Sequence, residues 1–312
     1  MPPDRPRDTP AARDESLAGV IADLHGLRPN AITRVEGHGS VNHVFVASSG
    51  PERFVIRFAR DARRKDEYEI EAWCLAQAAA HGIPSPAVVT RGTAKGVPYL
   101  IQTFVPGASG AASGGADRWT WLARYARTLH RVDVTSAPEG LFSRFGRDLP
   151  AGWSAHLEYN VEQLTPTDPL IRLGVYPLAR QGQFQSAFHR LALTPLNLGL
   201  LHGDLSPRNL ILQPDAPPVL LDWGTAATGP VPHGELLSLL RTHHATGEPT
   251  ADDLSRFAEG LDLSLTDDRE TLLDLLTLGA LDLVRWAIDQ RPDLVAEIAR
   301  ASRSLLQSPS PI

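Results

Sequence analysis

Three polar residues near the middle of the chain have the types and the spacing of a catalytic site. The stretch LLHGDLSPRNLIL, residues 200–212, places Asp204 after one apolar run and Asn209 just before another. A further apolar run, VLL at 219–221, leads directly into Asp222. If this run pairs antiparallel with the one after Asn209, their open end brings Asn209 beside Asp222, with Asp204 on the same edge. One carboxamide and two carboxylates supply oxygen ligands of the kind that suits Mg²⁺.

The pattern H-G-D-x-x-x-x-N followed by D-W-G resembles the catalytic loop and the metal-binding motif of kinase-like phosphotransferases. Protein kinases have arginine between the histidine and the aspartate of this motif. With glycine at that position, the motif instead resembles that of the aminoglycoside phosphotransferase and choline kinase group. The resemblance implies that Asp204 is the catalytic base for the acceptor hydroxyl. It also implies that Asn209 and Asp222 bind Mg²⁺ and that the phosphoryl donor is ATP, with GTP as an alternative.

Two other interpretations of these residues remain open at this point. Asp and Asn residues often shape ordinary turns, so each of the three could be purely structural. The second alternative is a metallohydrolase, with the ligands His202, Asp204, Asp222 and His233. Such a hydrolase would need no nucleotide-binding lobe, so the upstream sequence distinguishes the two enzymes.

The upstream sequence predicts a lobe of mixed α/β structure over residues 17–105. From the alternation of apolar and polar residues and from helical spacing, we expect a hairpin over 31–48, a strand over 53–59, a helix over 65–82 and a strand over 97–105. The helix should end at Gly82, which two prolines follow. The small-residue segment 107–117 indicates a lobe boundary, and the rest of the chain is predicted to be mostly helical.

The expected hairpin contains GHGSVNHVFV, which is similar to the nucleotide-positioning loop of the family. Gly37 and Gly39 allow backbone N–H groups to approach phosphate oxygens closely, and Ser40 and Asn42 add donors. By the resemblance, Gly39, Ser40 and Asn42 contact the nucleotide. Glycines also have a purely structural use in hairpin turns, so this stretch carries weight only together with the motifs that follow.

Arg57 departs from the family pattern, which has a lysine on this strand to hold the nucleotide phosphates. Glu71 lies on the inward apolar stripe of the next helix, where an unpaired carboxylate would be costly. These positions predict an Arg57–Glu71 ion pair, although Glu67, one turn earlier, could replace Glu71. A guanidinium is not equivalent to an ammonium, so a nucleotide-binding pseudokinase that acts through a partner stays an alternative. The chain has two lysines among 30 basic residues, which makes arginine here less unexpected.

The strand YLIQTFVPG runs into the predicted lobe boundary. By the resemblance, Gln102 is the gatekeeper, and the backbone of Thr103 and Val105 contacts the adenine. The features of the family follow one another in the family's order over most of residues 35–240. This order favours the phosphotransferase over the metallohydrolase.

Residues for the acceptor have weaker signals. Where relatives usually have an aspartate that opens a helix, this chain has Glu235. We expect Glu235 to cap the helix and suit its dipole, with substrate binding as the alternative. Asp282, on an apolar helix over 271–290, could face an amine-bearing substrate, but we expect it to pair with Arg285. The stretch 141–182 is a candidate acceptor lid.

Composition excludes several other classes of protein. Residues 251–312 hold twelve Asp or Glu and six Arg, so the net charge of this segment is −6, the same as that of the whole chain. The neutral remainder argues against a nucleic-acid partner, and the acidic segment could attract a cationic ligand. No apolar run is long enough to span a membrane, and the first residues do not resemble a signal peptide. The single cysteine, Cys74, fits a cytoplasmic protein.

The sequence therefore predicts an α+β bilobal fold similar to that of protein kinases. We expect a disordered tail over residues 1–16, a β-rich nucleotide-binding lobe with one main helix over 17–105, and a mostly helical catalytic and substrate-binding lobe over 106–312. The expected activity is Mg²⁺-dependent transfer of the γ-phosphoryl group of ATP or GTP to a hydroxyl of a small, hydroxylated molecule. An aminoglycoside or another antibiotic is the first acceptor class. Choline, a sugar or another metabolite is the second.

Overall fold

The computed structural model of the chain describes residues 10–35, 43–59, 65–112 and 117–307. The chain divides into two compact units: unit 1 with Met1–Ser109 and Leu210–Gly224, and unit 2 with Gly110–Asn209 and Thr225–Ile312. This division differs from the single boundary expected between residues 105 and 106. The segment Leu210–Gly224 belongs to unit 1 although it directly follows the candidate catalytic loop, residues 202–209, in the sequence.

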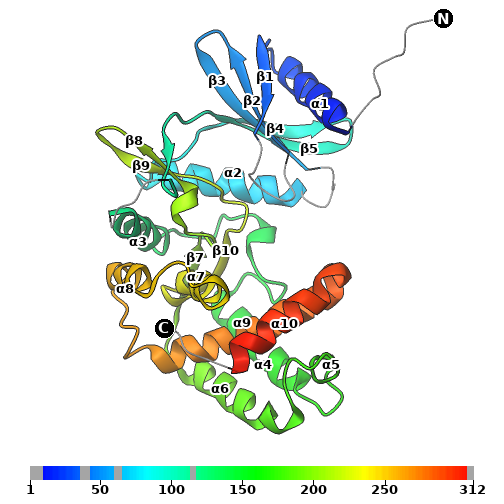
Figure 1. Cartoon of the computed structure of the whole chain (residues 1–312), viewed down its shortest axis with the longest axis vertical. Coiled ribbons are helices and arrows are strands. Elements are labelled where there is room, and N and C mark those ends of the chain that lie inside the picture. The colour runs from blue at the N-terminus through cyan, green and yellow to red at the C-terminus, as the bar shows by residue number, and fades with distance from the viewer. Residues whose placement is uncertain (1–9, 36–42, 60–64, 113–116, 308–312) are drawn as a thin grey trace, which may run out of the picture. The chain divides into compact units, whose positions relative to one another are not determined.

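Unit 1 is built around a five-stranded antiparallel sheet with the strand order β1-β2-β3-β5-β4 (Figure 1). Its strands are β1 (Ala31–Arg34), β2 (His43–Ser49), β3 (Glu52–Phe58), β4 (Val88–Ala94) and β5 (Val97–Thr103). The expected hairpin is present as β1 and β2, in which Ala31 pairs with Ser48. The two further expected strands are present as β3 and β5. β4 is an additional strand, whose central glycine interrupts the β-branched pattern by which a strand is recognised.

Helix α1 (Pro10–Leu24) covers one face of this sheet (Figure 1). Its apolar residues form one buried core with inward-facing residues of β2, β3 and β5. Asp14 is buried, and its Oδ2 lies 2.9 Å from His43 Nδ1 on β2. The expectation of a disordered tail over residues 1–16 is therefore wrong for residues 10–16, whose anchoring partner lies far along the chain. The first nine residues lie outside the described part of the structure.

Helix α2 (Lys65–Ala80) is the helix expected in unit 1, and it lies on the opposite face of the sheet. Side chains alternate along a strand, so Arg57 on β3 points away from the core that α1 covers. The antiparallel register of β3 and β5 puts Gln102 on the same face as Arg57. The helix ends before Gly82, as expected, and the φ of Gly82 is 73°, a conformation that favours glycine.

A second sheet in unit 1 has the order β6-β8-β9, with β6 (Ala108–Ser109), β8 (Leu210–Gln213) and β9 (Ala216–Leu220). The expected antiparallel pairing of the two apolar runs is confirmed, because Leu210 pairs with Leu220. Asp222 follows β9 in unit 1, whereas Asn209 is the last residue of its segment in unit 2. Their meeting at one metal ion therefore stays a prediction.

Unit 2 is mostly helical, as predicted. Its helices are α3 (Asp117–Leu129), α4 (Leu149–Gln163), α5 (Pro169–Arg172), α6 (Gln181–Leu193), α7 (His233–Thr246), α8 (Ala251–Gly260), α9 (Arg269–Gln290) and α10 (Val295–Gln307). Strands β7 (Asn197–Leu201) and β10 (Ala227–Val231) pair antiparallel and flank the catalytic loop in sequence. Helix α9 is the expected core helix, although Leu283 and Trp286 on it are exposed. No described helix combines the length and the apolar character that crossing a bilayer requires.

Candidate active site

Arg57 and Glu71 form a buried ion pair in unit 1, as their positions in the sequence predict. Arg57 Nη1 donates a hydrogen bond to Glu71 Oε1, so that Glu71, not Glu67, is the partner. The two residues are 9% and 1% exposed. Burial alone lowers the pKa of Arg57, but the carboxylates of Glu71 and Asp222 outweigh this effect and raise the pKa above its ordinary value. The guanidinium is therefore a permanent positive charge inside unit 1.

Gln102 is a third member of this network. Its Nε2 donates to Glu71 Oε1 at 2.9 Å, and the residue is buried. The same carboxylate oxygen thus accepts hydrogen bonds from Gln102 and from Arg57. Gln102, which the resemblance assigns to the gatekeeper position, therefore helps to hold Glu71 in place. The sequence did not predict this contact, because it depends on the register of β3 and β5.

Asp222 is the second carboxylate that contacts Arg57. Its Oδ1 accepts a hydrogen bond of 3.2 Å from Arg57 Nη2, so the guanidinium contacts two different carboxylates at once. Asp222 has a φ of 62°, a left-handed conformation that is unfavourable for a residue other than glycine. Its side chain is 52% exposed, unlike that of Glu71. Asp222 therefore offers an accessible carboxylate beside a buried cation.

The other residues that the sequence predicts to contact the nucleotide lie in the strand β5, just after it, and in the glycine loop. The N–H of Thr103 donates to the carbonyl of Ala87 at 2.9 Å, so an adenine contact at Thr103 would have to use its carbonyl oxygen. Within the described parts of the chain, the backbone N–H of Val105 donates to no backbone carbonyl. The glycine-loop residues, Gly39, Ser40 and Asn42, lie outside the described residues.

In unit 2, the catalytic loop depends on Gly203. This residue has a φ of 79°, and a Cβ atom placed on it would lie 2.4 Å from the carbonyl oxygen of Thr225. Thr225 also donates from its hydroxyl to the carbonyl of His202 at 3.2 Å. Glycine is therefore required in H-G-D both by the backbone conformation and by the space that the segment before β10 leaves.

Glu235 holds the backbone of the same loop. Its Oε1 accepts from the N–H of His202 at 2.6 Å, and its Oε2 accepts from the N–H of Gly203 at 3.2 Å. Burial raises the pKa of Glu235 to about 7. The expectation that Glu235 caps α7 is wrong, because both oxygens bind the loop. A substrate-binding role does not fit a residue that is 1% exposed.

Asp204 is bound by two neighbours in the loop. Arg208 Nη2 donates to Oδ1 at 2.8 Å and to Oδ2 at 2.6 Å. Asn209 Nδ2 donates to Oδ2 at 3.0 Å. The carboxylate is 20% exposed, while Arg208 is 64% exposed. Sequence reasoning missed Arg208, since an arginine in a loop is most often solvated, although its i, i+4 spacing from Asp204 was a signal.

Asn209 turns the nitrogen of its side-chain amide toward Asp204. Its Nδ2 donates to the carbonyl oxygen of Asp204 at 2.8 Å as well as to the carboxylate. Both partners are acceptors, so the nitrogen must face Asp204 and the amide oxygen faces elsewhere. This oxygen and the exposed carboxylate of Asp222 are hard oxygen donors, which fit Mg²⁺. Among the described residues, no group of three His, Cys, Asp or Glu side chains lies together in a way that could hold a metal ion.

Asp282 does not pair with Arg285, contrary to expectation. Its Oδ2 lies 2.7 Å from His156 Nε2, and its Oδ1 accepts from Asn160 Nδ2 at 2.9 Å. Arg285 instead donates from Nη2 to Asp168 Oδ2 at 2.9 Å and from Nη1 to Asn160 Oδ1 at 2.8 Å. Helix spacing allowed the Asp282–Arg285 pair, but α4 supplies better partners. Both oxygens of Asp282 are therefore engaged, which weakens its candidacy as a ligand for a substrate amine.

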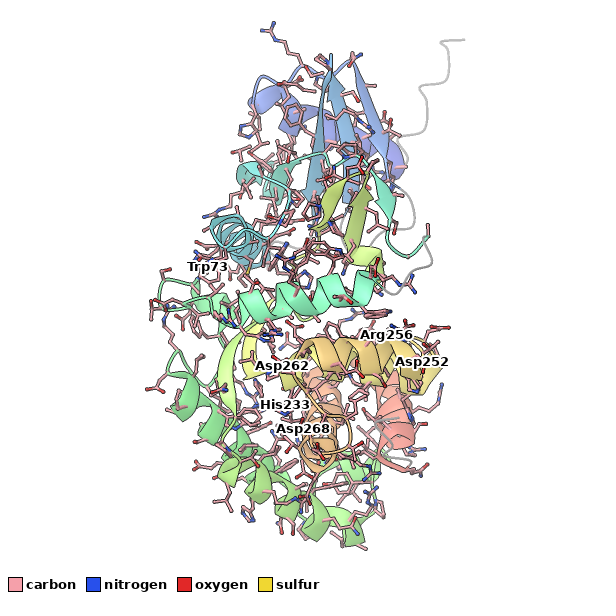
Figure 2. The ribbon with its side chains drawn as sticks, turned by 90° about the vertical axis from the view of Figure 1, so that its left-hand side faces the viewer. Trp73, His233, Asp252, Arg256, Asp262 and Asp268 are labelled. Atoms are coloured by element: carbon pink, nitrogen blue, oxygen red, sulfur yellow. The ribbon has the colours of Figure 1, made fainter. Side chains whose placement is uncertain are left out.

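The acidic C-terminal segment is partly neutralised by pairs. Figure 2 shows some of it, with labels at Asp252, Arg256, Asp262, Asp268 and the neighbouring His233. Asp262 lies 3.1 Å from Arg127, and Asp268 lies 3.6 Å from His233. Burial lowers the pKa of His233 despite the opposing effect of Asp268. The side chain of Asp262 remains 71% exposed, so its charge faces solvent in spite of the pair.

Comparison with known proteins gives this geometry its context. A family model described as the phosphotransferase enzyme family matches residues 31–273. No curated protein sequence matches the chain. The structure of macrolide 2′-phosphotransferase MphH from Brachybacterium faecium is similar, with a TM-score of 0.64, 20% identity, and coverage of 93% of this chain and 97% of that one.

Two aminoglycoside phosphotransferase structures are also similar. The GDP complex of a point mutant of aminoglycoside 2′-phosphotransferase-IIIa has a TM-score of 0.64, 16% identity, and coverage of 91% of this chain and 93% of that one. The gentamicin complex of APH(2″)-IIa has a TM-score of 0.61, 13% identity, and coverage of 93% and 98%. At these identities the solved structures show the fold alone, and they confirm the α+β, kinase-like bilobal fold.

The family match spans most of the chain and includes the catalytic loop, D-W-G, Arg57 and Glu71. It confirms the family that the H-G-D and D-W-G motifs indicated. The expected enzyme class, a small-molecule kinase, is confirmed at the level of this family. The chain belongs to the phosphotransferase enzyme family.

Proposed function

We propose that this protein transfers the γ-phosphoryl group of ATP or GTP to a hydroxyl of a small antibiotic, in a Mg²⁺-dependent reaction. The observation that carries the proposal is the geometry of the catalytic loop. Asn209 and Arg208 bind the Asp204 carboxylate, while Glu235 binds the backbone just before it. Similar structures that contain GDP, ADP and AMP-PNP support a nucleotide as the donor.

In the proposed reaction, Asp204 accepts the proton of the acceptor hydroxyl. The hydroxyl oxygen bonds to the γ-phosphorus, and the bond from that phosphorus to the β–γ bridging oxygen breaks, which releases ADP or GDP. The amide oxygen of Asn209 and the carboxylate of Asp222 would hold Mg²⁺, which neutralises phosphate charge when bound. Arg57 contributes a permanent positive charge for the nucleotide phosphates, and Glu71 and Gln102 fix its position.

Antibiotics are the first acceptor class because the similar structures include a macrolide phosphotransferase and aminoglycoside phosphotransferases in complex with gentamicin and with hygromycin B. His156 and Asn160 already bind the carboxylate of Asp282. This residue therefore gives no reason to prefer an amine-bearing aminoglycoside to a macrolide as the acceptor. Both antibiotic classes therefore belong in the test. The use of ATP or GTP makes the cytoplasm the proposed compartment.

A second candidate is a nucleotide-binding pseudokinase that acts through a partner. Arg57 in place of lysine favours this candidate, because its guanidinium is committed to Glu71 and Asp222. A pseudokinase would show no phosphoryl transfer under any condition.

The test incubates purified protein with Mg-ATP or Mg-GTP and a panel of aminoglycosides, macrolides and choline, and follows acceptor-dependent release of ADP or GDP. We expect release with at least one antibiotic, and mass spectrometry should find that antibiotic heavier by one phosphoryl group. Nucleotide-induced stabilisation without turnover of any acceptor would support the pseudokinase. Turnover of choline alone would contradict the antibiotic assignment.

A further inference from the structure

Arg57 joins two carboxylates that have different surroundings. Its Nη1 contacts Glu71, and its Nη2 lies 3.2 Å from Asp222 Oδ1. Glu71 is buried and is also held by Gln102 at 2.9 Å. Asp222 is half exposed and has no comparable second anchor among the described residues. The guanidinium is thus fixed from the Glu71 side, and Asp222 is the partner that ions in solution can reach.

We propose that Arg57 and a divalent cation compete for the Asp222 carboxylate, so that Arg57 sets the metal concentration at which the enzyme binds its nucleotide. This inference rests on the proposed function and adds a regulatory property to it. A cation that binds Asp222 must either take Oδ1 from Arg57 or sit close to a second positive charge, and both weaken metal binding. Arg57 cannot relieve this repulsion by losing its proton.

The competition depends on arginine rather than on positive charge alone. A guanidinium presents several N–H groups in a rigid planar fork, which lets Arg57 bind two carboxylates at once. The ammonium of a lysine is a compact point charge without this planar fork, and Glu71 would hold it on the side away from solvent. Asp222 would then be less neutralised. Arg57→Lys should therefore strengthen metal binding while the net charge of the site stays the same.

The experiment measures Mn²⁺ affinity by electron paramagnetic resonance, with the protein alone and with AMP-PNP. In the protein alone, Arg57→Lys should lower the Kd for Mn²⁺ by about fivefold or more, the lower end of typical coupling between sites. The double variant Arg57→Met with Glu71→Gln removes the buried pair without leaving an unpaired charge, and it should lower that Kd at least as much.

Matched controls come from Arg91 on β4 and Glu69 on α2, which form an exposed pair at 3.5 Å in the same unit. Arg91→Lys, and Arg91→Met combined with Glu69→Gln, should bind Mn²⁺ as the wild type does. The inference is overturned if the Arg57 variants have the affinity of the wild type and the controls, or if Arg57→Lys binds Mn²⁺ more weakly. Thermal melting of every variant verifies that it is folded, and the neutral double variant keeps the comparison available if Arg57→Lys is unstable.

Failure of the proposed function has a different signature. In that case, the wild type phosphorylates no antibiotic in the presence of Mg-ATP or Mg-GTP, whether or not a nucleotide raises its melting temperature. The titrations of the protein alone still decide whether Arg57 and the metal compete. The two hypotheses can therefore fail separately.

Discussion

Single residues in this site derive their roles from the groups that hold them. Glu235 illustrates this, because its carboxylate is buried and binds the backbone N–H groups of His202 and Gly203. These bonds fix the loop that presents Asp204. Burial raises the pKa of Glu235 to about 7, so its carboxyl group gains or loses a proton near neutral pH.

Replacement of Glu235 by glutamine should remove a pH dependence of stability. Between the ordinary pKa of about 4.5 and the folded pKa of about 7, the folded chain holds a proton that the unfolded chain has lost. The stabilisation that this proton gives is complete below pH 4.5 and is lost as pH rises to 7. The free energy of unfolding of the wild type, relative to Glu235→Gln, should therefore fall by about 2 kcal/mol between pH 5 and pH 7. Urea unfolding at pH 5 and pH 7 measures it, and a difference that does not change with pH would contradict the assignment.

The sequence predicted those site residues whose signal is local. Spacing in H-G-D-x-x-x-x-N and D-W-G indicated Asp204 and Asp222, and the apolar stripe on α2 indicated the Glu71 pair with Arg57. The partner of Glu235 lies 33 positions earlier in the chain, and no periodicity encodes such a contact. The Asp282–Arg285 pair failed for a related reason, since helix spacing permits a pair but does not exclude better partners on another helix.

At the scale of elements, the segment that follows β7 packs closely against the segment that precedes β10. β7 and β10 pair, and the carbonyl of Thr225 just before β10 fills the space that a side chain at Gly203 would need. The loop is therefore positioned by backbone packing as well as by the carboxylate of Glu235. Gly247 has the same φ of 79° at the end of α7, but a Cβ atom there meets nothing within 4 Å.

Gly203→Ala and Gly247→Ala form a matched pair for testing this contact. Both alanines would adopt a left-handed conformation, which costs about 1–2 kcal/mol. Only Gly203→Ala adds a clash with a backbone carbonyl, so it should lose more stability than Gly247→Ala and also reduce turnover. Urea unfolding and steady-state assays of the two variants test the prediction. Equal losses of stability would show that the contact with Thr225 is unimportant.

Elements with strong patterns were predicted, and elements that depend on distant partners were not. The helix at 65–80 and the hairpin of β1 and β2 have clear periodicity and flanking glycines or prolines. Helix α1 begins at Pro10 in a charged, proline-rich stretch, and its anchor is the buried contact of Asp14 with His43. The hairpin of β8 and β9 was predicted as local structure, but its membership of unit 1 depends on contacts with β6 and with Pro84, far away in the sequence.

At the scale of the whole molecule, the charge of the chain is concentrated in its C-terminal segment. Twelve carboxylates and six arginines lie in residues 251–312. Several of these carboxylates have partners, such as Asp274 with Arg190 at 2.6 Å and Asp293 with Arg291 at 2.8 Å. A net negative field remains because the arginines are outnumbered, and such a field attracts cations over the range that salt allows.

This imbalance predicts how acceptor binding depends on salt. If the acceptor is cationic, its KM should rise severalfold as ionic strength increases from about 0.01 M to 1 M, since the Debye length falls from about 30 Å to 3 Å. The assay must use saturating nucleotide, so that changes in nucleotide binding do not enter. An acceptor KM that ignores salt would instead indicate a neutral acceptor.

The assignment of Asp204 as catalytic base is the central claim, and Asp204→Asn tests it most directly. With an acceptor that the wild type phosphorylates, we expect kcat to fall by at least about 10²-fold, because asparagine cannot accept the proton. Binding of Mg-nucleotide, measured as the rise in melting temperature, should persist, whereas Asp222→Ala should lose it. Asp204→Asn with the turnover of the wild type would contradict the claim.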